Sequence, residues 1–210
     1  MPARTKGALT PVKTDQLTTR GAGDLVSRGL ADLQALDEVV EFPDKQLEAA
    51  VREELEKPAG PLTKRDLEAL ETLTANGDIQ DPTGLEYCVN LNELTLSGNQ
   101  ITDVSPLAEL TGLAWLYLDR NQITDLTPLA ELTGLTWLSL SWNQITDLTP
   151  LAGLTGLTWL YLDGNQITDL TPLAELTGLT WLSLDDNPLS AESARWYSNW
   201  KPAGVKDGND

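Results

Sequence analysis

The strongest constraint on this chain is a 22-residue unit that recurs through its central and C-terminal parts. A looser copy begins at Leu91 and a degenerate copy at Leu70. The near-copies, always the same distance apart, begin at Leu113, Leu135, Leu157 and Leu179. A fixed period of this length is typical of a solenoid, in which each unit forms one coil and stacks on its neighbours. Positions below are numbered from the first Leu of each unit.

Each unit carries the pattern of one short strand followed by one short helical turn. Leu stands at positions 1, 4 and 6, and the alternation over positions 3–6 predicts a strand with one buried face. Thr127-Pro128 predicts a helix N-cap followed by proline at the first helical position. The predicted strands lie near residues 93–96, 115–118, 137–140, 159–162 and 181–184.

Stacking turns each position of the unit into a ladder along the solenoid. Neighbouring strands should form a parallel sheet with a spacing of about 4.8 Å. Asn at position 9, such as Asn143, is expected to bond backbone groups of its own coil and of the next coil. Asp at position 13, such as Asp147, is expected to accept backbone N–H bonds at the helical turn.

The pattern L-x-x-L-x-L-x-x-N-x-I, followed by Asp-Leu-Thr-Pro-Leu-Ala, resembles the leucine-rich repeat, and in particular the internalin-like bacterial class. The resemblance covers roughly residues 42–210. It implies an α/β solenoid: a right-handed superhelix or arc with a concave parallel sheet, short helical turns on the convex side and a helical N-terminal cap. It also implies protein ligands on the concave sheet. Internalins are exported and surface-attached, but neither an export signal nor a wall-sorting motif is visible here.

The predicted organisation has five parts. Two helices should form the N-terminal cap, one after Asp44 and one after the capping box of Thr63 and Asp66. Ser190 should cap a C-terminal helix from which Trp196 covers the last coil. The parts are a disordered tail (1–22), an amphipathic helix (23–41) that docks a partner or packs on the solenoid's end, the helical cap (42–69), the repeats (70–189), and the C-terminal cap helix with a frayed tail (190–210).

The charge of the chain limits its partners. The net charge is −18, and the stretch from Leu70 to Ser190 holds 16 acidic residues and one basic residue, Arg120. Such a surface repels nucleic acid and anionic lipid. No apolar run approaches the roughly 18 residues that a membrane span needs. The N-terminus lacks the apolar segment of a secretory signal, so we expect a cytoplasmic protein, or an exported one if a signal has been removed.

Catalysis and cofactors find no support in the sequence. There is no His, and the single Cys88 is expected to be a small buried side chain. Without His and with only one Cys, the chain has neither a Ser-His or Cys-His dyad nor the ligands of a zinc site, so we expect no enzyme and no cofactor. Calcium is an alternative, because Asp163-Gly-Asn165 and Asp185-Asp186-Asn187 offer oxygen atoms, but the spacing of an EF-hand fails.

The positions expected to face solvent on the sheet are rich in aromatic residues. Position 3 is Trp in four successive coils, and such an apolar strip is typical of an interaction site. We therefore expect a non-enzymatic module that binds a protein or peptide carrying basic residues. The alternatives are carbohydrate binding, a structural or regulatory fragment of a larger protein, and indoles that only pack on each other. The candidate partner-binding residues are Trp115, Tyr117, Asp119, Arg120, Trp137, Ser139, Trp142, Trp159, Tyr161, Asp163, Trp181, Asp185 and Asp186.

The copies also differ from each other mainly at these positions. The copies from Leu113 and Leu157 differ at positions 2 and 8, and those from Leu135 and Leu157 differ at positions 5, 7, 8 and 19. Selection for a binding surface is one interpretation. Recent duplication with tolerance of change at solvated positions is the other.

Overall fold

The computed structural model describes residues 38–200, without the side chains of Trp196, Tyr197 and Trp200. The chain divides into two compact units, Met1–Glu38 and Val39–Asp210, and the repeats lie in the second. The predicted tail 1–22, most of the predicted helix 23–41 and the predicted frayed C-terminus lie outside the described residues.

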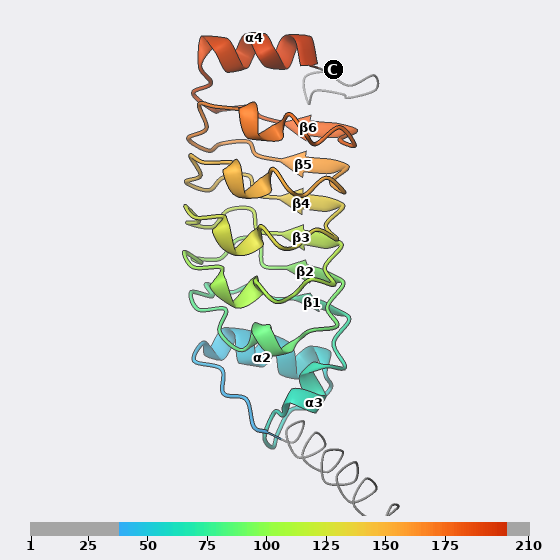
Figure 1. Cartoon of the computed structure of the whole chain (residues 1–210). Coiled ribbons are helices and arrows are strands. Elements are labelled where there is room, and N and C mark those ends of the chain that lie inside the picture. Colours follow the sequence, from blue (N-terminus) through green and yellow to red (C-terminus); the bar gives the residue numbers. More distant parts are fainter. Residues whose placement is uncertain (1–37, 201–210) are drawn as a thin grey trace, which may run out of the picture. The chain divides into compact units, whose positions relative to one another are not determined.

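Six short strands form one open parallel sheet, in which sequence order and spatial order are the same. Figure 1 shows them stacked along the unit, each contributed by one coil. They pair position by position, as in the pairing of Leu116 with Leu138. The predicted strands are confirmed, each one residue shorter than expected, and the degenerate coil adds a sixth. Their bounds are β1 Thr72–Thr74, β2 Glu93–Thr95, β3 Trp115–Tyr117, β4 Trp137–Ser139, β5 Trp159–Tyr161 and β6 Trp181–Ser183.

The apolar positions of the unit form one continuous core inside the coils. Side chains at positions 1, 4, 6 and 11, such as Leu135, Leu138, Leu140 and Ile145, have no exposed surface. Full burial of an aliphatic side chain of this size contributes about 1.5–3 kcal/mol. Because each coil supplies several such side chains and only its neighbours cover them, the stack is stable only as a whole.

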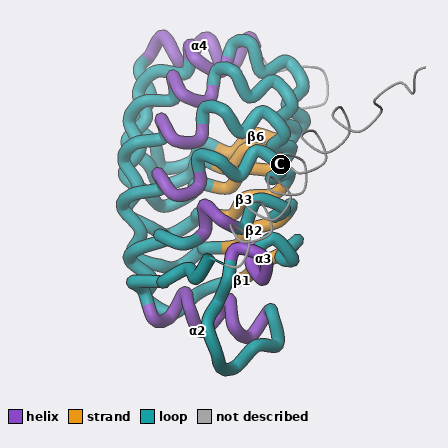
Figure 2. Tube along the Cα trace, turned by 60° about the horizontal axis from the view of Figure 1, so that its bottom comes forward, coloured by secondary structure: helices purple, strands orange, loops and turns teal. Residues whose placement is uncertain are grey.

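Short 3₁₀ helices lie opposite the strands, and Figure 2 shows them along one side of the stack. Their bounds are η1 Leu85–Tyr87, η2 Ser105–Leu107, η3 Thr127–Leu129, η4 Thr149–Leu151 and η5 Thr171–Leu173.

The expectation that Thr127 is an N-cap is wrong, because the helix begins at Thr127 itself and Leu126 precedes it without a capping side chain. The cap comes from position 13 instead, since the N–H of Thr127 donates to Oδ1 of Asp125 at 2.8 Å.

The Asn residues at position 9 link each coil to the one before it. Oδ1 of Asn143 accepts the N–H of Ile123 at 3.0 Å, and its amide nitrogen donates to the carbonyls of Leu118 and Leu140. The predicted bonds within the coil are confirmed. The bonds between coils go to the preceding coil, not to the next one. In the turn after its strand, the side chain of Asn143 lies beside the backbone of Leu118 and Ile123 in that preceding coil.

Two helices form the N-terminal end of the stack, α2 (Lys45–Glu54) and α3 (Lys64–Leu67). The carboxylate of Asp44 accepts the N–H groups of Gln46 and Leu47, as an N-cap does. Thr63 and Asp66 form the expected capping box.

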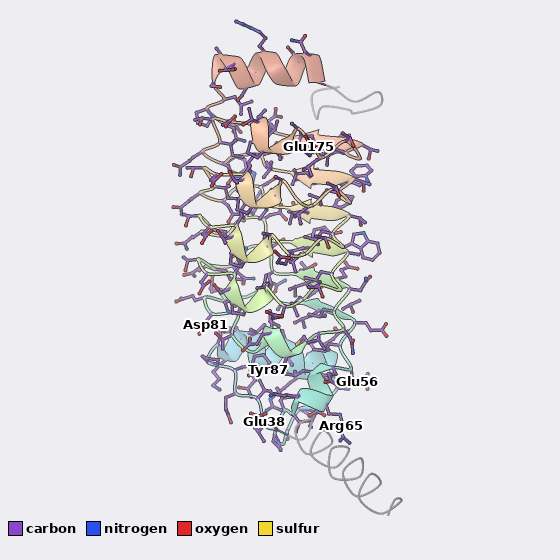
Figure 3. All side chains as sticks on the ribbon, in the orientation of Figure 1. Glu38, Glu56, Arg65, Asp81, Tyr87 and Glu175 are labelled. Carbon is purple, nitrogen blue, oxygen red and sulfur yellow. The ribbon has the colours of Figure 1, made fainter. Side chains whose placement is uncertain are left out.

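The cap is joined to the first coil by polar and apolar contacts. The second carboxylate oxygen of Asp44 accepts the N–H of Gln80 at 2.8 Å and that of Asp81, which Figure 3 labels beside α2. The ring of Phe42 lies so close to Gly84 that an added Cβ would sit 2.5 Å from it. Nζ of Lys64 lies 4.7 Å from the centre of the ring of Tyr87, which Figure 3 labels. These contacts fix the cap against the open end of the core.

At the other end, α4 (Ala191–Trp200) follows the last strand. The hydroxyl of Ser190 accepts the N–H of Ser193 at 3.0 Å, which confirms the predicted cap. The buried hydroxyl of Ser193 in turn accepts the N–H of Leu170 at 3.1 Å, so the start of α4 is bonded to the coil of β5. The predicted contact of Trp196 falls on a side chain outside the described ones. Within residues 38–200, no helix has the length and apolar character of a membrane span.

Candidate interaction surface on the strands

Positions 3 and 5 of four successive strands carry a continuous row of aromatic side chains on the side of the sheet that faces away from the core. We call this row the aromatic stripe. Its residues are Trp115 and Tyr117 on β3, Trp137 on β4, Trp159 and Tyr161 on β5, and Trp181 on β6. The stripe therefore spans the four regular coils. At the same positions, β1 carries Thr72 and Thr74, and β2 carries Glu93 and Thr95.

Three indoles of the stripe stack on each other. The ring centroids of Trp137 and Trp159 lie 5.0 Å apart with 20° between the planes, and those of Trp159 and Trp181 lie 5.5 Å apart with 21°. This is offset stacking, so the ring faces are turned toward neighbouring rings and the ring edges toward solvent. Trp115 makes no ring contact within the described part of the chain, and 40% of its surface is exposed. Packing of the indoles along the ladder is thus confirmed for three of the four.

The two tyrosines join this stack diagonally. The ring of Tyr161 lies 5.3 Å from that of Trp137 and 6.2 Å from that of Trp181, and Tyr117 lies 5.9 Å from Trp137. Burial raises the pKa of both tyrosines, and the nearby carboxylates of Asp119 and Asp163 raise the pKa further. The stripe is therefore apolar in its centre and bordered by negative charge.

The indole nitrogens of Trp137 and Trp181 are buried and have no hydrogen-bond partner among the described residues. An unpaired buried N–H destabilises a fold by about 1–3 kcal/mol. Both belong to coils with Ser at position 5, whereas the coils of Trp115 and Trp159 have Tyr there. The surface therefore alternates from coil to coil although the backbone does not.

Position 7 explains part of this alternation. The carboxylate of Asp119 accepts the hydroxyl of Ser97 from the preceding coil at 3.0 Å and the hydroxyl of Ser139 from the following coil. Asp163 does the same with Ser141 and Ser183. Each Asp thus bridges three coils. The copies differ at positions 5 and 7, and the side chains at these two positions form hydrogen bonds with each other across coils.

These bridges correct two expectations. Ser139 was expected to be exposed as a partner contact, but it is only 6% exposed and its hydroxyl is bonded to Asp119. The carboxylates of Asp119 and Asp163 were expected to flank the surface freely, and instead they are half-buried hydrogen-bond acceptors within the stack. Asp185 and Asp186, beyond β6, are exposed. They remain the candidate carboxylates most accessible to a partner.

Position 8, one turn past each strand, has a left-handed backbone in every regular coil. Glycine suits this conformation, and the chain has Gly98 and Gly164 there. The same φ, between 55° and 59°, is imposed on Arg120, Trp142 and Asp186, three of the predicted site residues. Trp142 is the most exposed aromatic among the described side chains, at 51%. A large side chain in this conformation is unusual and destabilising, by of order 1–3 kcal/mol.

Gly164 provides the space that Trp142 occupies. A Cβ at Gly164 would lie 2.6 Å from the indole of Trp142, so the ring lies directly over the glycine of the following coil. The indole is therefore held against the stack while much of its surface stays exposed.

Gly164→Ala should lower the free energy of unfolding by about 2 kcal/mol, because it adds backbone strain at φ +64° and a clash with Trp142. Gly98→Ala is the matched control, since φ is +72° and no atom lies within 4 Å of the added Cβ. Urea unfolding should show a larger loss of the free energy of unfolding for Gly164→Ala than for Gly98→Ala. Equal losses would mean that the Trp142 contact contributes nothing.

The Asp residues at position 13 and Cys88 are the side chains that bear on metal binding and thiol chemistry. Oδ1 of each position-13 Asp accepts the N–H two residues on, and hydrogen bonds from Ser105 lower the pKa of Asp103. Within the described residues, no three carboxylate, His or Cys side chains gather as a metal site would need. Burial raises the pKa of the Cys88 thiol to about 12, so it is unreactive at neutral pH.

Comparison with known proteins agrees with this architecture. A leucine rich repeat family model matches residues 111–167 and 133–189, and a model of leucine rich repeats in two copies matches residues 89–131. A search of curated proteins gave no match.

Several solved structures are similar to the chain. The internalin InlF of Listeria monocytogenes has 38% sequence identity and a TM-score of 0.70, over 71% of this chain and 45% of that one. A leucine-rich repeat protein of Leptospira interrogans has 31% identity and a TM-score of 0.62, over 68% of this chain and 38% of that one. Internalin C2 of Listeria monocytogenes has 34% identity over 79% of this chain and 94% of that one, with a TM-score of 0.46. The chain thus spans less than half of the first two relatives.

Proposed function

Because this chain is a leucine-rich repeat protein of the internalin-like class, whose fold commonly serves protein–protein interaction, we propose that it binds a protein or peptide through the aromatic stripe. The observation that carries the proposal is the stripe itself. It gathers six aromatic side chains on one face of a rigid sheet, and interfaces draw most of their affinity from a few such side chains.

The two most exposed tryptophans among the described side chains indicate how a partner would bind. Trp115, on β3, and Trp142, in the turn after β4 and outside the stripe, expose 40% and 51% of their surfaces. The stacked indoles on β4, β5 and β6 are half-buried and rigid, so little side-chain entropy is lost when a partner covers them. Trp115 and Trp142 are thus suited to act as anchors, and the stack as a flat base.

The charge around the stripe favours a basic partner. The repeats carry 16 acidic residues against Arg120 alone, and Asp185 and Asp186 are exposed beside β6. Charges at the rim of an interface act mainly on the rate of encounter and on the choice of partner. We therefore propose basic residues around an apolar centre in the ligand.

The stacked geometry favours a protein ligand over a sugar. Sugars stack on open aromatic faces, whereas stacked rings cover both faces of Trp159 and one face each of Trp137 and Trp181. The edges that remain exposed carry positive C–H groups, which suit carbonyl oxygens and apolar side chains.

Trp115→Ala should weaken binding of the native partner by about 2 kcal/mol, and it should act mainly on the dissociation rate. Partners would be captured from the source proteome with immobilised protein, and the strongest binder would then be purified and titrated by calorimetry. Trp115 is the best first choice because it is exposed and outside the ring stack, so its removal leaves the fold intact. Trp159→Ala is the second choice.

Glu131→Ala and Glu175→Ala are the matched controls. Both glutamates are exposed residues that follow the helical turns η3 and η5, and Glu175 is labelled in Figure 3. They should leave the affinity unchanged. If the Trp variants bind as tightly as the wild type, the partner uses another surface.

A further inference from the structure

Position 5 of the aromatic stripe repeats every second coil, whereas position 3 is Trp in every coil from β3 to β6. Position 5 is Tyr in β3 and β5, where the ring is half-buried, and a buried Ser in β4 and β6. Position 7 is the bridging Asp in the same two Tyr coils. The two buried indole nitrogens without a partner, those of Trp137 and Trp181, belong to the two Ser coils. Three separate features therefore share one two-coil period.

This period has a length that can be compared with the repeat of a ligand. Adjacent parallel strands lie about 4.8 Å apart, so two coils advance about 9.6 Å along the stack. The tyrosines at position 5 of β3 and β5 are thus repeated at that interval, with Ser139 at the same position of the strand between them.

Peptide conformations differ in the distance along the chain after which a side chain returns to the same side. An extended strand returns a side chain to the same side every 6.6 Å or so, which matches neither one coil nor two. An α-helix rises about 5.4 Å per turn, close to one coil, and would not use the alternation. A polyproline II helix has three residues per turn and advances about 9.3 Å per turn. Only the last repeat is close to the two-coil period.

The chemistry of the stripe agrees with this match. Polyproline II segments leave their carbonyls without internal hydrogen bonds and are recognised elsewhere by rows of aromatic side chains. The stripe offers ring edges and tyrosine hydroxyls, and positions 3 and 5 of β3–β6 hold no aliphatic side chain of the kind that lines helix-binding grooves.

From these observations, we infer that the ligand of the aromatic stripe is a proline-rich segment with basic residues, which lies along the stack as a polyproline II helix with one turn per two coils. The inference rests on the proposed function and specifies the partner. The basic residues face the carboxylates of Glu93, Asp185 and Asp186 at the two ends of the stripe.

The test is calorimetric titration of the full chain with three synthetic peptides of equal length and charge. The first has about nine prolines between arginines, enough for three turns. The second replaces the prolines by glycine and serine, and the third is an amphipathic basic helix. The proline peptide should bind at least about tenfold more tightly than the other two, because it is already ordered in the bound conformation.

Variants then locate the binding to the alternating residues. Tyr161→Ser introduces the residue that the sister coils carry at this position, and it should weaken the proline peptide roughly tenfold. Trp115→Ala should have a similar effect without disturbing the ring stack. Tyr161→Phe keeps the ring and loses only the hydroxyl, so it should weaken the proline peptide less than Tyr161→Ser does. Glu175→Gln should change nothing.

Equal binding of the glycine-serine peptide would show that charge alone acts, and tighter binding of the helical peptide would replace polyproline II by a helix. Either result overturns the inference, as does the absence of binding by the proline peptide. The proposed function stands in all these cases if the native partner still depends on Trp115. It fails separately if that dependence is missing.

Discussion

Asn143→Ala should lower the free energy of unfolding by about 3 kcal/mol or more. Only 7% of the surface of Asn143 is exposed, and its side chain forms hydrogen bonds with one backbone N–H and two backbone carbonyls. Alanine leaves the N–H of Ile123 without a partner, whereas the carbonyls of Leu118 and Leu140 keep the amide bonds of Asn121 and Asn165. An unsatisfied buried N–H destabilises by about 1–3 kcal/mol, and each of the two lost hydrogen bonds adds about 0.5–1.5 kcal/mol, so the effect exceeds that of an ordinary surface change.

Gln144→Ala is the matched control, since Gln144 is the exposed neighbour in the same turn and its backbone bond to Ile123 is kept. It should change the stability by less than about 0.5 kcal/mol. Urea unfolding followed by circular dichroism measures both variants. A loss for Asn143→Ala no greater than that for Gln144→Ala would show that the Asn ladder does not hold the coils together.

Deletion of residues 42–69 should abolish cooperative unfolding and cause aggregation. The segment buries Phe42, Leu47, Val51, Leu62 and Leu67 against the first coil. At about 1.5–3 kcal/mol for each buried side chain, its loss removes a large part of the 5–15 kcal/mol that stabilises a typical domain. It also leaves the leucines of the first coil in contact with water.

A single substitution tests the contribution of the N-terminal cap without removing the whole segment. Leu47→Ala should destabilise by about 3 kcal/mol, because the side chain has no exposed surface. Glu53→Ala, on an exposed position of the same helix α2, should have little effect. A soluble deletion product as stable as the full chain would mean that the cap does not protect the core.

The regular features of the fold were predictable because they depend on local pattern and on the fixed period. Leu138 alternates with Trp137, so one faces the core and the other does not, whatever the neighbouring coils contain. The capping box of Thr63 and Asp66 lies within four residues and was equally visible. The strands, the parallel sheet and the Asn ladder follow from the same kind of argument.

The features that were missed depend on distances between coils. Nothing in the spacing of Asp119 shows that its carboxylate reaches hydroxyls on both sides, at Ser97 and Ser139. The left-handed backbone at Trp142 was hidden because only two of the five coils from Leu91 onward, those of Gly98 and Gly164, have Gly at this position. In hindsight, the shared occurrence of Asp at position 7 and Tyr at position 5 was the available signal for the coupling.

These bridges change how the differences between copies are interpreted. Selection for binding and tolerance of change were the two explanations that the sequence suggested. Hydrogen bonding across coils is a third, since Ser139 and Ser183 fill the places that Asp119 and Asp163 require. Trp115, Trp142 and the tyrosines, which the bridges do not involve, are therefore the stronger candidates for contact with a partner.

Hydroxyl-radical footprinting of the wild-type chain, free and saturated with its native partner, tests most directly whether the aromatic stripe is the binding surface. Oxidation of Trp115, Tyr117 and Tyr161 should fall severalfold in the complex as the partner covers them. Tyr87, beside the N-terminal cap and labelled in Figure 3, should react equally in both states. Unchanged oxidation of the stripe in the complex, with protection at Tyr87 or elsewhere, would contradict the account.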